Sequence, residues 1–224
     1  MLPKGNICYQ KETVLIMVIN DVLDEVFSTW SNVAVFRVLN KYAIGLSGRE
    51  VARLAGMSAK NCIITLSSLE NMGLVNRVRG GRDHLFTLNR DHFLVKEGII
   101  PLLDVEDKYS EAVFKDIKKK LKKKCNSVYV FGSVARKEED TDSDLDLCII
   151  YDKENQKEAL EEAMYGLQSL LRKKYTVNTS PFYISATQFA IKAKKNKPPV
   201  AEVIKDGKLL FGNSIKVLLN AERS

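Results

Sequence analysis

Two short motifs have the residue types and the spacing needed to bind a metal-bound phosphate. Gly132 and Ser133 stand at the end of the apolar run 128–131, and Asp144 and Asp146 follow after ten intervening residues. A Gly-Ser turn presents backbone N–H groups and a hydroxyl to an anion. Side chains alternate along a strand, so the two carboxylates share one face, where their oxygens suit Mg²⁺. The motifs therefore predict metal-assisted phosphoryl or nucleotidyl transfer.

These motifs resemble those of the DNA polymerase β-type nucleotidyltransferase superfamily, especially its minimal nucleotidyltransferase domains. The resemblance runs over residues 126–152. It implies that Gly132 and Ser133 contact the phosphates of a nucleoside triphosphate. It also implies that Asp144 and Asp146 bind the divalent metal, with Mg²⁺ as the expected cofactor.

The basic residue Arg136 matches one that commonly follows the Gly-Ser turn in this family, and we expect it to neutralise charge that develops during transfer. The family usually has glycine at the next position, where this chain has Lys137. The charged run 138–143 would also fit a hairpin with a solvated loop. We favour the functional interpretation, because an apolar strand, a Gly-Ser pair and an Asp-x-Asp motif seldom coincide.

The elements that must position this site continue beyond residue 152. Apolar residues recur at helical spacing over 153–174, and 175–184 predicts a third strand. The family normally has a third carboxylate on that strand, which binds metal and deprotonates the attacking hydroxyl. This chain offers Asn178, Thr179 and Ser180 there, and of these we place Asn178 in the nucleotide site. An amide cannot accept a proton at neutral pH, so turnover is the open question.

The first half of the chain has the pattern of consecutive short helices. An apolar stripe over 31–42 predicts the first of them. Ser47 and Glu50 have the spacing of a capping box that opens a second helix. Ser58 can cap a third helix that runs to about residue 72.

A hairpin with arginines around its tip follows the third helix. Residues 74–79 and 82–88 predict two strands joined by a Gly-Gly turn. From residue 22 to residue 95, this order of elements resembles the winged helix-turn-helix domains of small prokaryotic transcription regulators. The resemblance implies that 58–69 is the recognition helix and that 77–82 is the wing.

We expect this domain to bind duplex DNA, mainly through phosphates rather than base edges. The spacing of Cys62, Leu66 and Leu69 predicts the buried face of the recognition helix. Its other face would present Ile63 and Ile64, which fit thymine methyl groups or a protein contact. Winged helices also serve as dimerisation or protein-interaction modules, so that alternative stays open. The expected DNA-binding residues are Lys60, Asn61, Arg77, Arg79 and Arg82.

A connecting helix is predicted over 104–124 by an apolar stripe at intervals of four residues: Val105, Tyr109, Val113, Ile117 and Leu121. Its other faces carry seven lysines from Lys115 onward. Such a run attracts tRNA, DNA or an acidic partner, but it is more often simply solvated.

Composition sets broad limits. The chain has 224 residues, a net charge of +7 and a pI near 9.1, which favour polyanionic partners. The spacing of Cys8, Cys62, Cys125 and Cys148 predicts neither a zinc site nor a disulfide framework. The apolar run 14–19 is far shorter than the roughly 20 residues that span a membrane. We therefore expect a soluble cytoplasmic protein without a membrane partner.

These observations predict an α+β protein of two domains. Residues 1–95 form an N-terminal winged helix-turn-helix domain, 96–124 form a connecting helix, and 125–224 form a C-terminal polymerase β-like nucleotidyltransferase domain with a small mixed sheet. The expected activity is transfer of a nucleoside monophosphate from a nucleoside triphosphate to an RNA, protein or other acceptor. The alternatives are a transcription regulator whose second domain senses a nucleotide without turnover, and an antitoxin. A homodimer remains open.

Overall fold

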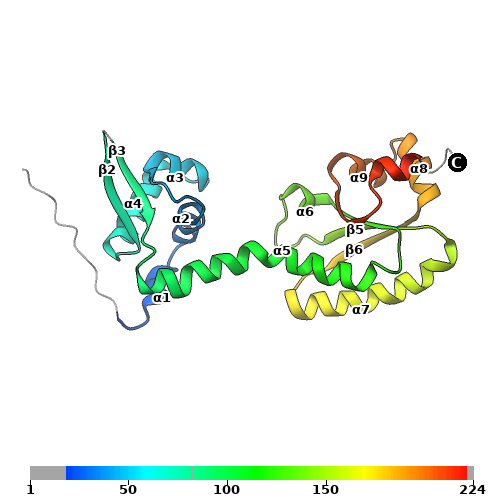
Figure 1. Cartoon of the computed structure of the whole chain (residues 1–224), viewed down its shortest axis with the longest axis horizontal. Coiled ribbons are helices and arrows are strands. Elements are labelled where there is room, and N and C mark those ends of the chain that lie inside the picture. Colours follow the sequence, from blue (N-terminus) through cyan, green and yellow to red (C-terminus); the bar gives the residue numbers. More distant parts are fainter. Residues whose placement is uncertain (1–18, 82, 221–224) are drawn as a thin grey trace, which may run out of the picture. The chain divides into compact units, whose positions relative to one another are not determined.

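A computed structural model of the protein describes residues 19–81 and 83–220 (Figure 1). The chain divides into two compact units, Met1–Asp107 and Lys108–Ser224, and the boundary falls within one helix. The sequence-based predictions for Cys8, for Arg82 and for nearly all of the run 14–19 lie outside the described residues.

The N-terminal unit is a winged helix. Its helices are α1 (Val22–Val26), α2 (Trp30–Lys41), α3 (Gly48–Leu54) and α4 (Ala59–Asn71). Its antiparallel sheet has the order β1-β3-β2, with β1 (Leu46–Ser47), β2 (Val75–Gly80) and β3 (Asp83–Leu88). A π-helical turn η1 (Val95–Ile99) leads into α5 (Ile100–Leu121).

Local capping signals set the helix starts of this unit. The backbone N–H of Ser47 donates to the Glu50 carboxylate at 2.8 Å, and the Ser47 hydroxyl accepts from the N–H of Glu50, which confirms the capping box. The Ser47 hydroxyl also donates to the Glu50 carboxylate, and this bond, together with the one from the Ser47 N–H, holds the pKa of Glu50 below its usual value. Ser58 caps α4 by accepting from the N–H of Asn61. The predicted buried residues Cys62, Leu66 and Leu69 all lie in the core.

The C-terminal unit is built on a sheet of order β6-β5-β4-β7. Its strands are β4 (Ser127–Phe131), β5 (Leu145–Tyr151), β6 (Thr179–Ser185) and β7 (Lys208–Gly212). Strand β4 is antiparallel to β5 and β7, whereas β5 and β6 are parallel, which confirms the predicted mixed sheet. The helices that follow α5 are α6 (Gly132–Arg136), α7 (Lys157–Tyr175), α8 (Ala186–Lys194), α9 (Val200–Asp206) and α10 (Ile215–Asn220), with a 3-10 turn η2 (Glu154–Gln156) before α7.

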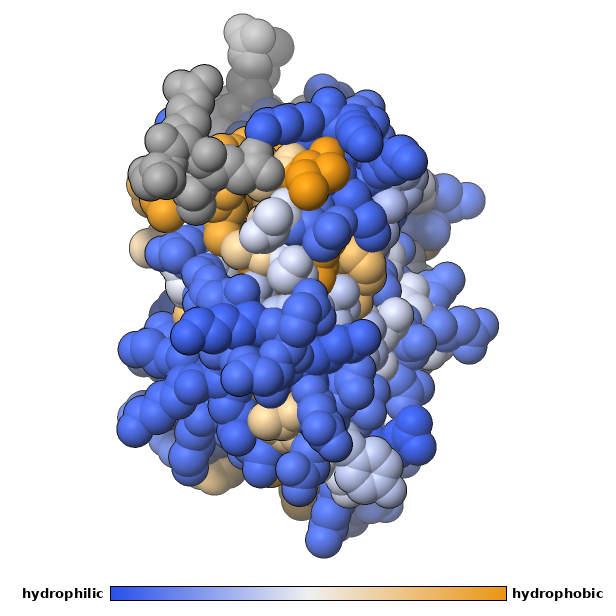
Figure 2. Space-filling model, turned by 90° about the vertical axis from the view of Figure 1, so that its right-hand side faces the viewer, coloured by the Kyte–Doolittle hydropathy of each residue, from blue (hydrophilic) through white to orange (hydrophobic). Residues whose placement is uncertain are grey.

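The two faces of this sheet pack against different helices (Figure 1). Leu147 and Ile149 of β5 join a core with α5 and α7. Cys148 and Ile150 join a second core with α8 and α9 on the other face. Asp146 alternates with Leu147 and so shares the face of α9. The face of the unit seen in Figure 2 is predominantly hydrophilic.

The apolar stripe of α5 is not buried along its whole length. Val113 and Ile117 are buried against the sheet, whereas Val105 is 63% exposed. The unit boundary at Asp107 explains the difference, because the stripe can cover the sheet only beyond it. Before the boundary, Leu103 faces the N-terminal core instead.

The predicted third strand begins later than expected. Helix α7 extends to Tyr175, because Thr176 takes a left-handed conformation that ends the helix, and β6 starts at Thr179. Strand β7 and helices α8, α9 and α10 are further elements that the sequence patterns do not predict.

The described cysteines are free thiols, and burial raises the pKa of Cys148 to about 12. Over the described ranges 19–81 and 83–220, we find no helix with the length and apolar character needed to cross a membrane.

Candidate functional site

The carboxylate of Asp146 lies directly over Gly132. Phe131, the last residue of β4, pairs with Asp146 of β5 in the antiparallel ladder, and Gly132 follows with φ of 70°. A Cβ at Gly132 would collide with Oδ2 of Asp146. Only glycine therefore allows the turn after β4 to approach the carboxylate this closely.

Two carboxylates meet at this edge of the sheet. Asp144 is exposed just before β5, and Asp146 is half-buried. Burial raises the pKa of Asp146 first of all, and the negative charges of Asp144 and Glu202 raise it further, whereas a hydrogen bond from Ser180 and the charge of Arg136 lower it. A divalent cation would relieve this repulsion, so the residues present fit the predicted metal.

A cation held here would take much of its coordination from outside the protein. Within the described part of the chain, no group of three or more His, Cys, Asp or Glu side chains is arranged to hold a metal ion. Mg²⁺ commonly binds through one or two carboxylates and completes its shell with phosphate oxygens and water. The pair Asp144 and Asp146 is sufficient for that mode.

Arg136 lies at the end of the short helix α6 that carries Gly132 and Ser133. Its Nε is 2.7 Å from Oε2 of Glu138, and this contact, with the charges of Asp206 and Glu202, raises the pKa of the guanidinium above its usual value. The next residue, Lys137, has φ of 62°. The related family usually has glycine there, and this left-handed conformation supplies the physical reason.

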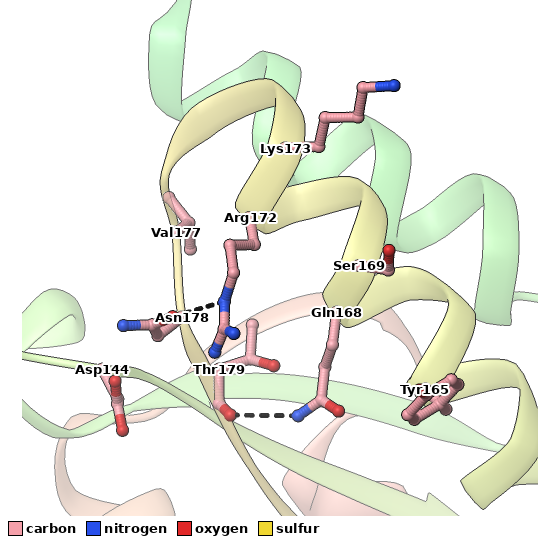
Figure 3. Close-up of a pocket in the computed structure, with 9 residues that line it drawn as sticks. All are labelled: Asp144, Tyr165, Gln168, Ser169, Arg172, Lys173, Val177, Asn178 and Thr179. Atoms are coloured by element: carbon pink, nitrogen blue, oxygen red, sulfur yellow. Dashed lines mark hydrogen bonds between the residues drawn. The ribbon is translucent and has the colours of Figure 1, made fainter.

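Strand β6 places Ser180, and not Asn178, directly beside Asp146. Ser180 is the register partner of Asp146 in the parallel ladder. Asn178 precedes the strand, and its backbone carbonyl accepts from the N–H of Leu145 at 2.9 Å. Its side-chain Oδ1 accepts from Nε of Arg172 at 3.1 Å (Figure 3). The predicted nucleotide-site residue is therefore already held by an arginine from α7.

A cavity of about 720 Å³ opens beside Asp144 (Figure 3). It lies between α7 and the start of β6, and its lining consists of Asp144, Tyr165, Gln168, Ser169, Arg172, Lys173, Val177, Asn178 and Thr179. The sequence patterns do not predict that the α7 side chains line this cavity or that Glu202 lies close enough to Asp146 to raise its pKa. The only available signal was a second, polar stripe along α7, which looks like an ordinary solvated face.

The predicted DNA-binding residues lie in the other unit. Lys60 and Asn61 are exposed in the first turn of α4, beside Ile63 and Ile64, which are 48% and 60% exposed. Arg77 of β2 forms a 3.0 Å ion pair with Glu70 of α4, so part of its charge is already neutralised. Arg79 is exposed further along β2.

Comparison with known proteins matches residues 115–216 to the family described as "Polymerase beta, Nucleotidyltransferase". The C-terminal part of the chain is thus a polymerase β-type nucleotidyltransferase domain. No curated protein matches the sequence.

Several solved structures are similar to parts of the chain. The PcaV transcriptional regulator from Streptomyces coelicolor, solved with its natural ligand, is 24% identical with a TM-score of 0.29, over 42% of this chain and 74% of that one. A toxin-antitoxin solved with AMP-PNP is 18% identical with a TM-score of 0.32, over 49% and 91%. A mutant of the toxin-antitoxin MntA-HpeT is 17% identical with a TM-score of 0.33, over 49% and 91%.

Proposed function

We propose that this protein transfers a nucleoside monophosphate from a Mg²⁺-bound nucleoside triphosphate to an acceptor hydroxyl. The observation that carries the proposal is the Asp146 carboxylate packed onto Gly132, with Asp144 beside it at an exposed edge of the sheet. The match of residues 115–216 to a nucleotidyltransferase family supports the same chemistry.

Each residue of this edge has a role in the proposed reaction. Asp144 and Asp146 would hold Mg²⁺, which when bound polarises the phosphate and offsets its charge. Gly132 and Ser133 would bind the phosphates through backbone N–H groups and the Ser133 hydroxyl. Arg136 would neutralise charge on the departing pyrophosphate.

In the transfer step, the acceptor oxygen forms a bond to the α-phosphorus while the bond from that phosphorus to the bridging oxygen breaks, and pyrophosphate leaves. The acceptor proton passes to water. Ser180 and Asn178, which occupy the neighbouring segment, cannot take up that proton at neutral pH. This arrangement predicts slow turnover.

A transfer assay tests the proposal. The purified full chain is incubated with Mg²⁺, with each α-labelled nucleoside triphosphate and with RNA, protein extract or small acceptors, and transferred label is measured. Asp144→Asn and Asp146→Asn should each abolish transfer. Asp142→Asn, which removes the same charge from the exposed loop before the site, should transfer normally.

A second function is favoured by one specific observation. The position beside Asp146 holds a serine and not a carboxylate, so the site is suited to binding a nucleotide without turning it over. In that function the domain senses a nucleotide. Mg²⁺-dependent nucleotide binding without any labelled product would support the sensor.

We further propose that the winged helix binds duplex DNA through Lys60, Asn61, Arg77, Arg79 and Arg82. The exposure of Lys60 and Asn61 at the start of α4 supports this assignment. We expect contacts to phosphates rather than to bases to supply most of the affinity. The ion pair between Arg77 and Glu70 weakens the share that Arg77 can contribute.

A further inference from the structure

Helix α7 has two chemically different faces. Its apolar residues Leu160, Met164, Leu167 and Leu171 pack into the core beneath the sheet. A second set follows the same helical spacing on another face, and Tyr165 in that set is 79% exposed. The second face consists of Tyr165, Gln168, Ser169, Arg172 and Lys173, and all five line the cavity beside Asp144.

Hydrogen bonds to the edge strand hold this face in place. Nε2 of Gln168 donates to the carbonyl of Thr179 at 3.2 Å, and Nε of Arg172 donates to Oδ1 of Asn178 at 3.1 Å. Figure 3 shows both side chains reaching from α7 toward the start of β6, with Asp144 beyond Asn178 and Tyr165 further along the helix. Together the helix and the strand form a groove that ends at the candidate metal site.

The chemistry of the groove suits a chain of nucleotides. Arg172 and Lys173 supply two positive charges, against one negative charge from Asp144. A guanidinium has five N–H donors, and the contact to Asn178 uses one of them. The exposed ring of Tyr165 offers a face on which a base can stack. Val177 is the one aliphatic side chain among the described residues of the lining, so an apolar protein segment fits poorly.

We propose that this groove binds the acceptor as the 3′ end of a single-stranded nucleic acid, with its terminal hydroxyl at Asp144. Arg172 and Lys173 contact its phosphates, and Tyr165 stacks on a base further from the terminus. The proposal rests on the proposed function, since it names the acceptor of that same reaction. Binding can be tested separately from transfer, because the groove residues would bind the nucleic acid without metal or nucleoside triphosphate.

Binding of single-stranded RNA to the full chain tests the groove. The probe is a fluorescein-labelled RNA of about 12 nucleotides. It is titrated by fluorescence anisotropy without metal or triphosphate, with excess unlabelled duplex DNA to occupy the winged helix. Tyr165→Ala should weaken binding about 5- to 150-fold, which is the range expected for one stacked base. Tyr165→Phe keeps the ring and should bind like the wild type.

The charged part of the groove has its own variant and a matched control. Arg172→Gln combined with Lys173→Gln should weaken RNA binding and reduce the slope of log affinity against log salt by about 1.4, since two phosphate contacts are lost. Lys195→Gln combined with Lys197→Gln removes the same charge after α8, a helix of the other face of the sheet. That control should bind RNA normally. Thermal unfolding confirms that each variant is folded.

These measurements distinguish a failure of the proposed groove from a failure of the proposed transfer reaction. Asp146→Asn should lose Mg²⁺-dependent nucleotide binding but keep RNA binding, and the groove variants should do the reverse. If no nucleotide is ever transferred while the groove variants lose RNA, the proposed function is wrong and the groove stands. RNA affinity that is unchanged in both groove variants would overturn the groove, as would label that is transferred only to protein.

Discussion

Ser180 is the register partner of Asp146 in the parallel ladder of β5 and β6, where burial raises the pKa of the Asp146 carboxyl and Ser180 lowers it. In the related family, a third carboxylate on the neighbouring strand binds metal and accepts the proton of the attacking hydroxyl. The register places Ser180 at the point of that strand closest to Asp146. The lack of a general base therefore follows from the residue at this one position, which is a serine and not a carboxylate.

Ser180→Asp should raise the rate of nucleotide transfer, or create transfer where none occurs. General base catalysis typically contributes about 10² to 10⁴-fold, which sets the upper range of the gain. The assay needs saturating Mg²⁺, because a third like charge is unfavourable without metal.

Asn178→Asp is the matched control for this prediction. It adds the same charge two residues earlier, where Arg172 already holds the side chain, so its gain should be much smaller. A larger gain from Asn178→Asp than from Ser180→Asp would show that Asn178 faces the metal.

Asp146→Asn should increase the free energy of unfolding of the metal-free protein at neutral pH. Burial and the charges of Asp144 and Glu202 raise the folded-state pKa of Asp146 above its unfolded value. Ionisation of Asp146 therefore destabilises the folded state. The contribution of this group to the free energy of unfolding is fully present below its unfolded pKa of about 3.9 and is lost as pH rises through the folded pKa. The advantage of the variant should appear above that range and vanish near pH 4.

Denaturant unfolding of both proteins across this pH range measures the difference. Mg²⁺ with a nucleoside triphosphate should stabilise the wild type and leave Asp146→Asn unchanged. A variant that is less stable than the wild type at neutral pH would show that the ionised carboxylate is favourable in the fold.

Lys137→Gly should increase the free energy of unfolding of the C-terminal unit by about 0.5 to 1 kcal/mol. Lys137 has φ of 62°, a conformation that costs a side-chain-bearing residue about 1 to 2 kcal/mol, and the greater backbone entropy of unfolded glycine offsets part of the gain. Lys137→Ala removes the same side chain and keeps the strain, so it should not stabilise. Equal effects of both variants in thermal unfolding would assign the change to the lost lysine charge instead.

Glu70→Gln should strengthen binding to duplex DNA, because it frees Arg77 from its 3.0 Å ion pair. Arg77→Ala, Arg79→Ala and Arg82→Ala together should weaken binding about equally for different DNA sequences. Each lost phosphate contact should lower the salt slope by about 0.9.

Gel shifts at several salt concentrations measure both effects. Wild-type retention in the triple variant, with no gain from Glu70→Gln, would assign the winged helix to protein contacts. The exposed isoleucines Ile63 and Ile64 of α4 would then be the first residues to test.

Sequence patterns predicted the parts of this fold that local chemistry determines. The capping box of Ser47 and Glu50 and the buried stripe of α4 are set within a few residues, and the structure confirms them. The parallel strand β6 also follows from a local run of residues, although its start is displaced by the left-handed Thr176.

The remaining features depend on contacts between distant segments. The nearness of Glu202 to Asp146 follows from the packing of α9 over the face of the sheet that carries Asp146, which no local pattern reveals. In the sequence, the groove face of α7 has the pattern of an ordinary solvated face. Only the three-dimensional structure shows that the start of β6 lies beside it. Val105 fits the apolar spacing of α5 but lies in the other unit, where that stripe has nothing to cover.

The central claim is that Gly132, Asp144 and Asp146 form a site for a Mg²⁺-bound nucleotide. Calorimetric titration of the full chain with a nonhydrolysable nucleoside triphosphate, with and without Mg²⁺, tests this most directly. Wild type and Asp142→Asn should bind with equal affinity only when Mg²⁺ is present, and Asp144→Asn and Asp146→Asn should show no binding. Equal affinity in all four proteins, or binding that does not depend on Mg²⁺, would contradict the site.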